Sequence, residues 1–174
     1  MAKHFLALLL FAGLAQAEEI ANPLIDYAAF QSGVERVGAV REAHRVTEFE
    51  FMLMASDPST VILDARSREK FELLHVKGAK NLSLPDMTED DLAKVIPSKS
   101  TRILIYCNNN FLNEPKAFPS KNFSASLNVY TMNVLFAYGY TNVFELGPLI
   151  DIRSTRIPFE RASRAVQPQA VQNR

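Results

Sequence analysis

The sequence predicts an α/β protein with a central, mainly parallel sheet and helices on both of its faces. Two segments, residues 61–65 and 101–107, contain short apolar runs with β-branched residues, Val61–Leu63 and Ile103–Ile105, which is typical of strands covered on both sides. Segments with helical spacing of apolar residues separate these strands from each other and from a third strand, residues 141–146. Strands that alternate with helices along a chain favour a parallel sheet.

Capping and turn residues predict where the helices begin and end. Thr47 with Glu50 three residues later has the form of a capping box, so a helix is expected from there to about residue 55. Gly139 is placed to end a longer helix that begins near Ser124. The other expected elements are a short helix at 27–31, a helix at 68–74 capped by Ser67, a strand at 81–84, a helix at 88–96 and an edge strand at 157–159.

The chain of 174 residues is expected to form one folded domain with a removable leader. Residues 1–17 have a basic start, an apolar core and the sequence Ala15-Gln16-Ala17, which is the pattern of a secretory signal peptide. This predicts export to the periplasm, with no stable membrane span after the leader is removed, since the apolar run is too short to cross a bilayer. Residues 18–45 are expected to be an N-terminal extension, 46–159 the domain and 160–174 a disordered tail.

The composition excludes several kinds of function. Nineteen basic and nineteen acidic residues leave no positive excess to neutralise phosphates, so nucleic acid is not expected as a partner. One cysteine excludes an internal disulfide and a multi-cysteine zinc site, and three histidines offer few other ligands. The sequence therefore predicts no metal centre and no cofactor.

The single cysteine, Cys107, is the main candidate for chemistry. It ends an apolar strand and is followed at once by three asparagines. In open α/β sheets ligands bind beyond the carboxyl ends of the strands, which is where this thiol is expected. One interpretation is a small, inert, buried side chain; the other is a reactive thiol kept unpaired in an oxidising compartment.

Three motifs follow one another in an order and spacing typical of one family. They are Asp64-Ala65-Arg66 with the turn His75-Val76-Lys77-Gly78-Ala79-Lys80-Asn81, the strand end Tyr106-Cys107, and Gly139-Tyr140-Thr141-Asn142-Val143. Together they resemble the rhodanese-like (sulfurtransferase) family over about residues 47–159. The resemblance implies a single rhodanese-like domain, Cys107 as a catalytic persulfide carrier, a small sulfur-containing donor and a thiol acceptor. It also places Asp64, Arg66 and His75 in structural roles near the site.

The loop after Cys107 departs from the family pattern, which is a compact loop with a glycine and often an arginine. No glycine occurs between Gly78 and Gly139, and the next helix is expected only near Ser124. The candidate active-site loop consists of Asn108, Asn109, Asn110, Phe111, Leu112 and Asn113. Asparagine tolerates left-handed backbone conformations, so the first three could replace glycine in a cradle of N–H groups; the alternative is a plain turn.

The loop also carries less positive charge than the family pattern, because no arginine occurs between Arg102 and Arg153. Lys116 and Lys121 are the candidate substrate-binding cations, with simple solvation as the alternative. Residues 113–124 are expected to form a lid over Cys107. We expect the rings of Phe111, Phe118 and Phe123 to be buried beneath it.

Three functions are compatible with these residues. The first is a sulfurtransferase, and the second is a non-catalytic module that uses the same scaffold to bind a periplasmic protein partner. The third is a phosphatase of the same fold. It is set aside because Leu112 and Asn113 stand where an arginine must hold the phosphate. The cysteine at the strand end favours the sulfurtransferase, whereas the altered loop favours the binding module.

Overall fold

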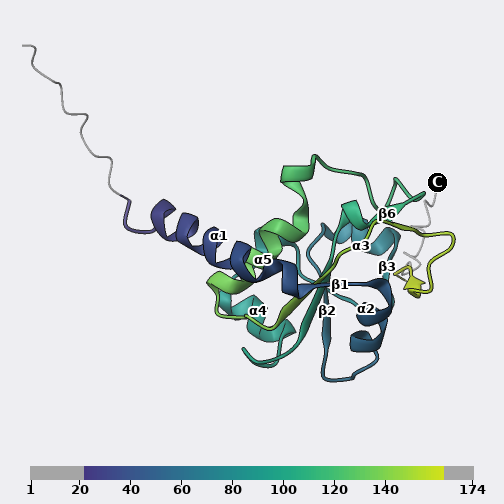
Figure 1. Ribbon diagram of the computed structural model, residues 1–174, viewed down its shortest axis with the longest axis horizontal. Coiled ribbons are helices and arrows are strands. Elements are labelled where there is room, and N and C mark those ends of the chain that lie inside the picture. The colour runs from purple at the N-terminus through teal and green to yellow at the C-terminus, as the bar shows by residue number, and fades with distance from the viewer. Residues whose placement is uncertain (1–21, 163–174) are drawn as a thin grey trace, which may run out of the picture.

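The computed structural model describes residues 22–162 of the 174-residue chain. The predicted signal peptide, residues 1–17, and residues 163–174 of the predicted tail lie outside the described residues. At the centre is a five-stranded sheet in which all neighbouring strands are parallel (Figure 1). Its order is β1 (Arg45–Val46), β7 (Val143–Leu146), β5 (Ile103–Tyr106), β2 (Val61–Asp64) and β4 (Lys80–Asn81). The predicted α/β fold with a mainly parallel sheet is confirmed.

Helices cover both faces of this sheet, and two small strand pairs lie beside it (Figure 1). The helices are α1 (Tyr27–Arg41), α2 (Glu48–Ala55), α3 (Arg68–Leu73), α4 (Glu89–Val95) and α5 (Leu127–Ala137), with 3-10 turns η1 (Glu42–His44), η2 (Leu84–Asp86), η3 (Asn108–Asn110) and η4 (Phe123–Ala125). The small pairs are β3 (His75–Val76) with β9 (Phe159–Glu160), antiparallel, and β6 (Phe111–Leu112) with β8 (Ile150–Asp151), parallel.

The strand residues alternate between two cores, because successive side chains of a strand point to opposite faces. Leu63 and Ile105 contribute to the core beneath α1, α4 and α5. Ile62 and Leu104 contribute to the other core, which α2, α3 and the segment after Cys107 cover. All eight residues of β2 and β5 are buried, so the continuous apolar runs in the sequence correspond to strands covered on both faces.

The N-terminal extension is more structured than the sequence predicts. The expected short helix at 27–31 is the start of α1, which continues to Arg41 and packs against α5. Only Val37 of α1 is buried, and the first part of the helix projects from the body of the molecule (Figure 1). The edge strand β1 was not predicted, since two residues carry no periodic signal; it begins inside the expected extension, at Arg45.

The predicted start of the disordered tail at residue 160 is wrong. Glu160 belongs to β9, and its carboxylate accepts a hydrogen bond from the backbone N–H of Gly78 at 2.9 Å, which lowers the pKa of Glu160. The backbone N–H of Ala162 donates to the carbonyl of Glu72. The chain is therefore held against the domain through at least residue 162.

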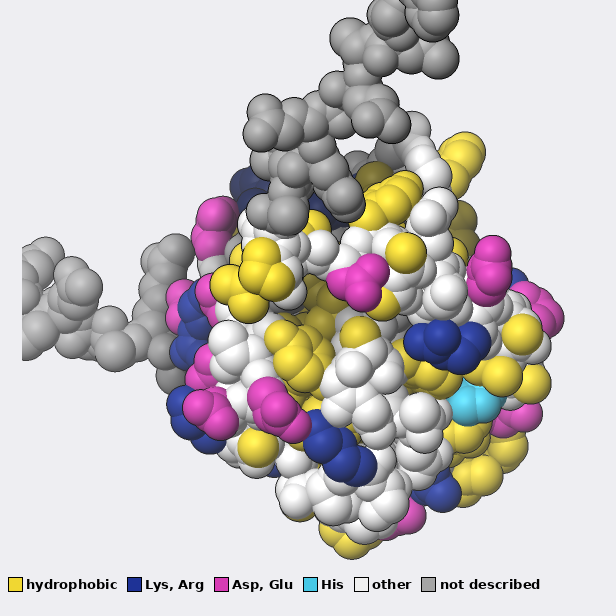
Figure 2. Space-filling model, turned by 90° about the vertical axis from the view of Figure 1, so that its left-hand side faces the viewer, with side chains coloured by type: hydrophobic (Ala, Val, Ile, Leu, Met, Phe, Trp, Pro, Cys, Tyr) yellow, Lys and Arg dark blue, Asp and Glu magenta, His cyan; other side chains and the backbone are white. Residues whose placement is uncertain are grey.

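Figure 2 shows the end of the molecule from which α1 projects. Acidic and basic side chains are interspersed there with hydrophobic ones, and neither sign of charge forms a continuous field. Among residues 22–162, no helix combines the length and the apolar character needed to cross a membrane. The exposed apolar side chains at the start of α1 are Leu24, Ile25, Tyr27, Phe30 and Val34.

The segment between Cys107 and α5 is packed onto the domain at its first half only. Phe111 and Phe118 are buried, with ring centroids 4.7 Å apart. Both rings also contact Phe159 of β9. The expectation that Phe123 is buried with them is wrong: it is 92% exposed, since the chain leaves this cluster after Phe118 to reach the start of α5.

This difference predicts opposite outcomes for two similar substitutions. Phe118→Ala should lower the free energy of unfolding by about 3–5 kcal/mol, because it removes a fully buried ring and leaves a cavity. Phe123→Ala should change it by no more than about 0.5 kcal/mol, because its ring is already in solvent. Urea unfolding of both variants measures the effect. Equal destabilisation would contradict the packing described.

Candidate functional site

Cys107 lies at the carboxyl end of β5 and is only 1% exposed. Its Sγ is 3.4 Å from the hydroxyl oxygen of Ser126, which is the residue that precedes the first turn of α5. The N-terminus of an α-helix carries partial positive charge from its unpaired N–H groups. The thiol therefore lies close to the partially positive N-terminus of α5.

Asn110 holds the backbone of Cys107 to the neighbouring strand. Its Oδ1 accepts hydrogen bonds from the backbone N–H of Cys107 at 2.9 Å and from Nδ2 of Asn128 at 3.2 Å. Its Nδ2 donates to the carbonyls of Leu146 at 2.7 Å and Pro148 at 3.2 Å. One buried side chain thus ties the ends of β5 and β7 together and fixes where the thiol lies.

The asparagines after Cys107 do not adopt the left-handed conformations expected for a glycine-like cradle. Asn108, Asn109 and Asn110 form the 3-10 turn η3, and Asn113 is the one non-glycine residue of the described chain with positive φ, at 69°. Their side chains organise the loop instead. Asn109 accepts from the backbone N–H of Lys121 at 2.8 Å and donates to its carbonyl at 3.0 Å, which closes the loop on itself.

Cys107 lines a hollow of about 280 Å³ whose charged residues the sequence did not reveal. Arg41 comes from the end of α1, Arg45 from β1 and Glu145 from β7, and all three line this hollow with Cys107. Both arginines come before residue 47, where the family-like motifs begin, and no local sequence pattern predicts a role for them. They lie close to the cysteine only because β1 joins the sheet beside β7.

Glu145 is 2% exposed and receives both arginines on the same oxygen. Its Oε1 lies 2.6 Å from Nη2 of Arg41 and 3.0 Å from Nε of Arg45. Its Oε2 and Nε of Arg41 are both buried and have no hydrogen-bond partner. Burial raises the pKa of Glu145, and the two arginines oppose that shift. Two arginines and one carboxylate thus line the hollow and leave one net positive charge among them.

The structure does not bring the two candidate lysines to this hollow. Lys116 is exposed. Lys121 lines a separate hollow of about 580 Å³, together with Arg66 and Asn108. Leu112 is 44% exposed in β6, and Asn113 follows it in the chain. The positive charges at the Cys107 hollow are therefore arginines of the N-terminal segment.

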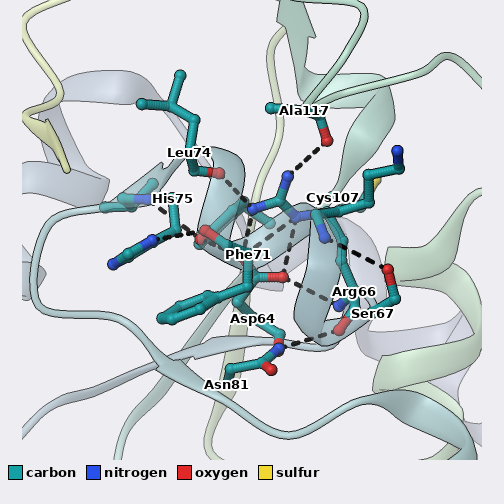
Figure 3. Close-up of polar contacts among 12 residues, drawn as sticks. Asp64, Arg66, Ser67, Phe71, Leu74, His75, Asn81, Cys107 and Ala117 are labelled. Carbon is teal, nitrogen blue, oxygen red and sulfur yellow. Dashed lines mark hydrogen bonds and ion pairs between the residues drawn. The ribbon is translucent and has the colours of Figure 1, made fainter. Parts of the chain in front are cut away.

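Asp64 and Arg66 form a buried ion pair on the other side of the cysteine loop (Figure 3). Nη2 of Arg66 lies 2.5 Å from Oδ2 of Asp64 and also donates to the carbonyl of Leu74 at 2.8 Å. Nη1 donates to the carbonyl of Ala117 at 2.8 Å. The hydroxyl of Tyr106 donates to Asp64, and burial and this carboxylate raise the pKa of Tyr106 well above its usual value. Arg66 thus connects the sheet to the segment after Cys107.

His75 begins β3, which follows α3, and is not among the residues that line the hollow of Cys107. Its Nδ1 is 2.7 Å from the carbonyl oxygen of Phe71, and the two rings stack with centroids 3.6 Å apart. Its Nε2 is 3.3 Å from the carboxylate of Glu160. Both ring nitrogens therefore hold neighbouring segments together.

The described chain is an α/β protein with a parallel sheet, and its cysteine lies at the carboxyl end of the central strand β5. Within that class, the chain matches the Rhodanese-like domain family over residues 47–148 and belongs to it. No curated protein matched the chain in a sequence search.

Several solved structures are similar to this chain. A rhodanese-like domain from Anabaena sp. is 20% identical, with 75% of this chain and 89% of that chain covered and a TM-score of 0.49. A rhodanese with anions from E. coli is 22% identical, with 59% and 98% covered and a TM-score of 0.41. EanB, with a cysteine persulfide and ergothioneine, is 16% identical, with 67% and 28% covered and a TM-score of 0.45.

The role of Asn110 can be separated from that of its neighbour. Asn110→Ala should lower the free energy of unfolding by about 2–4 kcal/mol, because it leaves the buried N–H of Cys107 and the carbonyl of Leu146 unpaired. Asn109→Ala removes exposed hydrogen bonds and should cost about 1 kcal/mol or less. Denaturant unfolding tests both. A loss in Asn110→Ala no larger than that in Asn109→Ala would show that the loop does not depend on Asn110.

Proposed function

We propose that this protein is a sulfurtransferase that carries sulfane sulfur as a persulfide on Cys107. The observation that carries the proposal is the position of the thiol, which lies at the carboxyl end of the central strand, close to the start of α5 and in a hollow with two arginines. Membership of the rhodanese-like family is compatible with this activity. The partners proposed are a small sulfur-containing donor and a thiol acceptor.

The transfer takes place in two displacements at sulfur. The Cys107 thiolate attacks the outer sulfur of a donor persulfide; a new S–S bond forms, the donor S–S bond breaks, and its electron pair leaves with the donor thiolate. An acceptor thiolate then attacks the outer sulfur of the Cys107 persulfide and releases the Cys107 thiolate. No external oxidant or reductant is consumed. Negative charge is present throughout, and the N-terminus of α5 and the arginines stabilise it.

Thiosulfate is proposed to be a poor donor. Two negative charges would enter a hollow with one net positive charge, whose arginines are already paired with the buried carboxylate of Glu145. A persulfide group brings at most one negative charge, and a polysulfide spreads its charge over a chain of sulfur atoms, so each loses less hydration on entry. Cys107 is 1% exposed and lines this hollow, so the hollow is the proposed route of the donor to the thiol.

The alternative is a rhodanese-like module without catalysis, which binds a periplasmic protein. The observations that favour it are the low exposure of Cys107 and the exposed apolar residues Leu112 and Phe123, which flank the segment after the cysteine. Sulfur loading on the thiol distinguishes the two functions, because a non-catalytic binding module is not expected to accept sulfur on Cys107.

The function is tested by incubating the protein with polysulfide and, separately, with thiosulfate. Wild type should gain one sulfur atom from polysulfide about ten- to a hundred-fold faster than from thiosulfate, the size expected for one unfavourable charged contact. Cys107→Ser should gain none. Intact mass spectrometry measures the gain. If neither donor loads sulfur onto the wild type, the binding module replaces the sulfurtransferase.

We also propose that the protein acts in the periplasm after residues 1–17 are removed. A basic start, an apolar core and Ala15-Gln16-Ala17 support the cleavage after Ala17. In cells, the expected species is a periplasmic protein that begins at Glu18, and the control Ala15→Arg/Ala17→Arg should block processing. Intact mass of the periplasmic and membrane fractions gives the result. A full-length chain in the membrane fraction would refute the proposal.

A further inference from the structure

We infer that the hydroxyl group of Ser126 is a catalytic hydrogen-bond donor, which stabilises the Cys107 thiolate as it leaves the persulfide in the second displacement. This inference rests on the proposed sulfur transfer and adds to it a residue that contacts the reacting atom. It is carried by the contact of this hydroxyl with Sγ, by its absence from the helix cap, and by the side chains that hold the contact in place.

The contact between the hydroxyl and the sulfur is direct. Oγ of Ser126 is 3.4 Å from Sγ of Cys107, and both residues line the hollow of about 280 Å³. Within residues 22–162, no other side chain makes a polar contact with this sulfur. A thiolate has no hydrogen atom to donate, so the hydroxyl is the donor whenever Cys107 is ionised.

The helix that Ser126 begins does not use this hydroxyl. Serine is favoured at the residue before a helix because its oxygen can accept a hydrogen bond from a free backbone N–H group. The side chain of Ser126 makes no such bond to α5. The other four α-helices of the described chain do have this cap, in each case from the side chain of the residue before the helix: Asp26, Thr47, Ser67 and Thr88. The hydroxyl at the start of α5 is therefore free to contact the sulfur.

Two buried asparagines hold the contact in place. Nδ2 of Asn128, in the first turn of α5, donates to Oδ1 of Asn110 at 3.2 Å. The same oxygen accepts from the backbone N–H of Cys107 at 2.9 Å. The start of α5 and the backbone of Cys107 are thus fixed relative to each other. A donor that is in position before the reaction stabilises developing charge without the cost of reorganisation.

The second displacement is the step in which this donor has the largest effect. The acceptor thiolate forms an S–S bond with the outer sulfur, the bond from that sulfur to Sγ breaks, and the electron pair stays on Sγ. Negative charge develops on Sγ in the transition state, so the hydrogen bond from Ser126 strengthens there. In the first displacement the same bond favours the thiolate but weakens it as a nucleophile, so the two effects partly cancel.

Release of sulfur from the loaded protein tests the inference. Wild type is loaded with polysulfide, freed of the excess and mixed with 2-mercaptoethanol, and intact mass follows the loss of one sulfur atom. Ser126→Ala should lose its sulfur about three- to ten-fold more slowly, the size expected for one hydrogen bond, and its loading rate should change less.

Matched variants assign the effect to the hydroxyl. Ser126→Thr keeps this group and should restore the rate of release. Ser124→Ala is the control and should release sulfur at the wild-type rate, because the hydroxyl of Ser124 bonds to Asn122 and its residue does not line the hollow. Thermal unfolding of Ser126→Ala should match that of wild type, since the hydroxyl caps no backbone group. Ser126→Gly, which also lacks the hydroxyl and is tolerated at this helix position, repeats the measurement if the alanine variant does not fold.

The outcomes separate this inference from the proposed function. If wild type takes up and releases sulfur and the variants without the hydroxyl release it equally fast, the inference is overturned while the sulfurtransferase stands. If wild type gains no sulfur, the proposed function fails and the inference fails with it. Slow release that Ser126→Thr does not restore, in a folded protein, also overturns the inference.

Discussion

A carboxyl group buried to the extent of Glu145 is costly unless charged partners compensate it, and this requirement connects the main parts of the molecule. The compensating arginines come from the end of α1 and from β1, before the family-matched region begins at residue 47. The extension is thus attached to the sheet by a charge pair that lines the same hollow as Cys107. Loss of Glu145 would leave Arg41 without a carboxylate partner and Arg45 with only the exposed Glu42, so the edge strand and the charges beside the thiol depend on this one carboxylate.

The long loop after Cys107 is held by side chains instead of glycine conformations. At its start, Asn110 binds the carbonyl of Leu146 at the end of β7. Further along, Arg66, which is paired with Asp64, binds the carbonyl of Ala117. Its guanidinium also lies 4.1 Å from the centre of the Phe118 ring, which adds a cation–π contact. The longer loop of this chain is therefore fixed at its start and near its middle by side chains.

Much of the fold could be predicted from the sequence because its signals are local. The strands at 61–64 and 103–106 contain the apolar runs 61–63 and 103–106, and the capping box at Thr47 forms as predicted. The charged cluster could not be predicted, because Arg41 and Glu145 are 104 positions apart and only the sheet order brings them together. Nor does local sequence distinguish a buried phenylalanine from an exposed one five residues later in the same loop. The position of Cys107 could be predicted from the strand that it ends, whereas its charged neighbours could not be predicted from the sequence.

The claim that the N-terminal segment supplies the positive charge felt by Cys107 can be measured with two alkylating reagents. Iodoacetate is anionic and iodoacetamide is neutral, so the ratio of their rates with the thiol reports the local electrostatic potential. In the double variant Arg41→Gln/Arg45→Gln this ratio should fall several-fold relative to wild type, as expected for removing two unit charges that line the same hollow as the thiol. The control variant Arg36→Gln should leave it unchanged. A ratio that is the same in the double variant and in wild type would contradict the account.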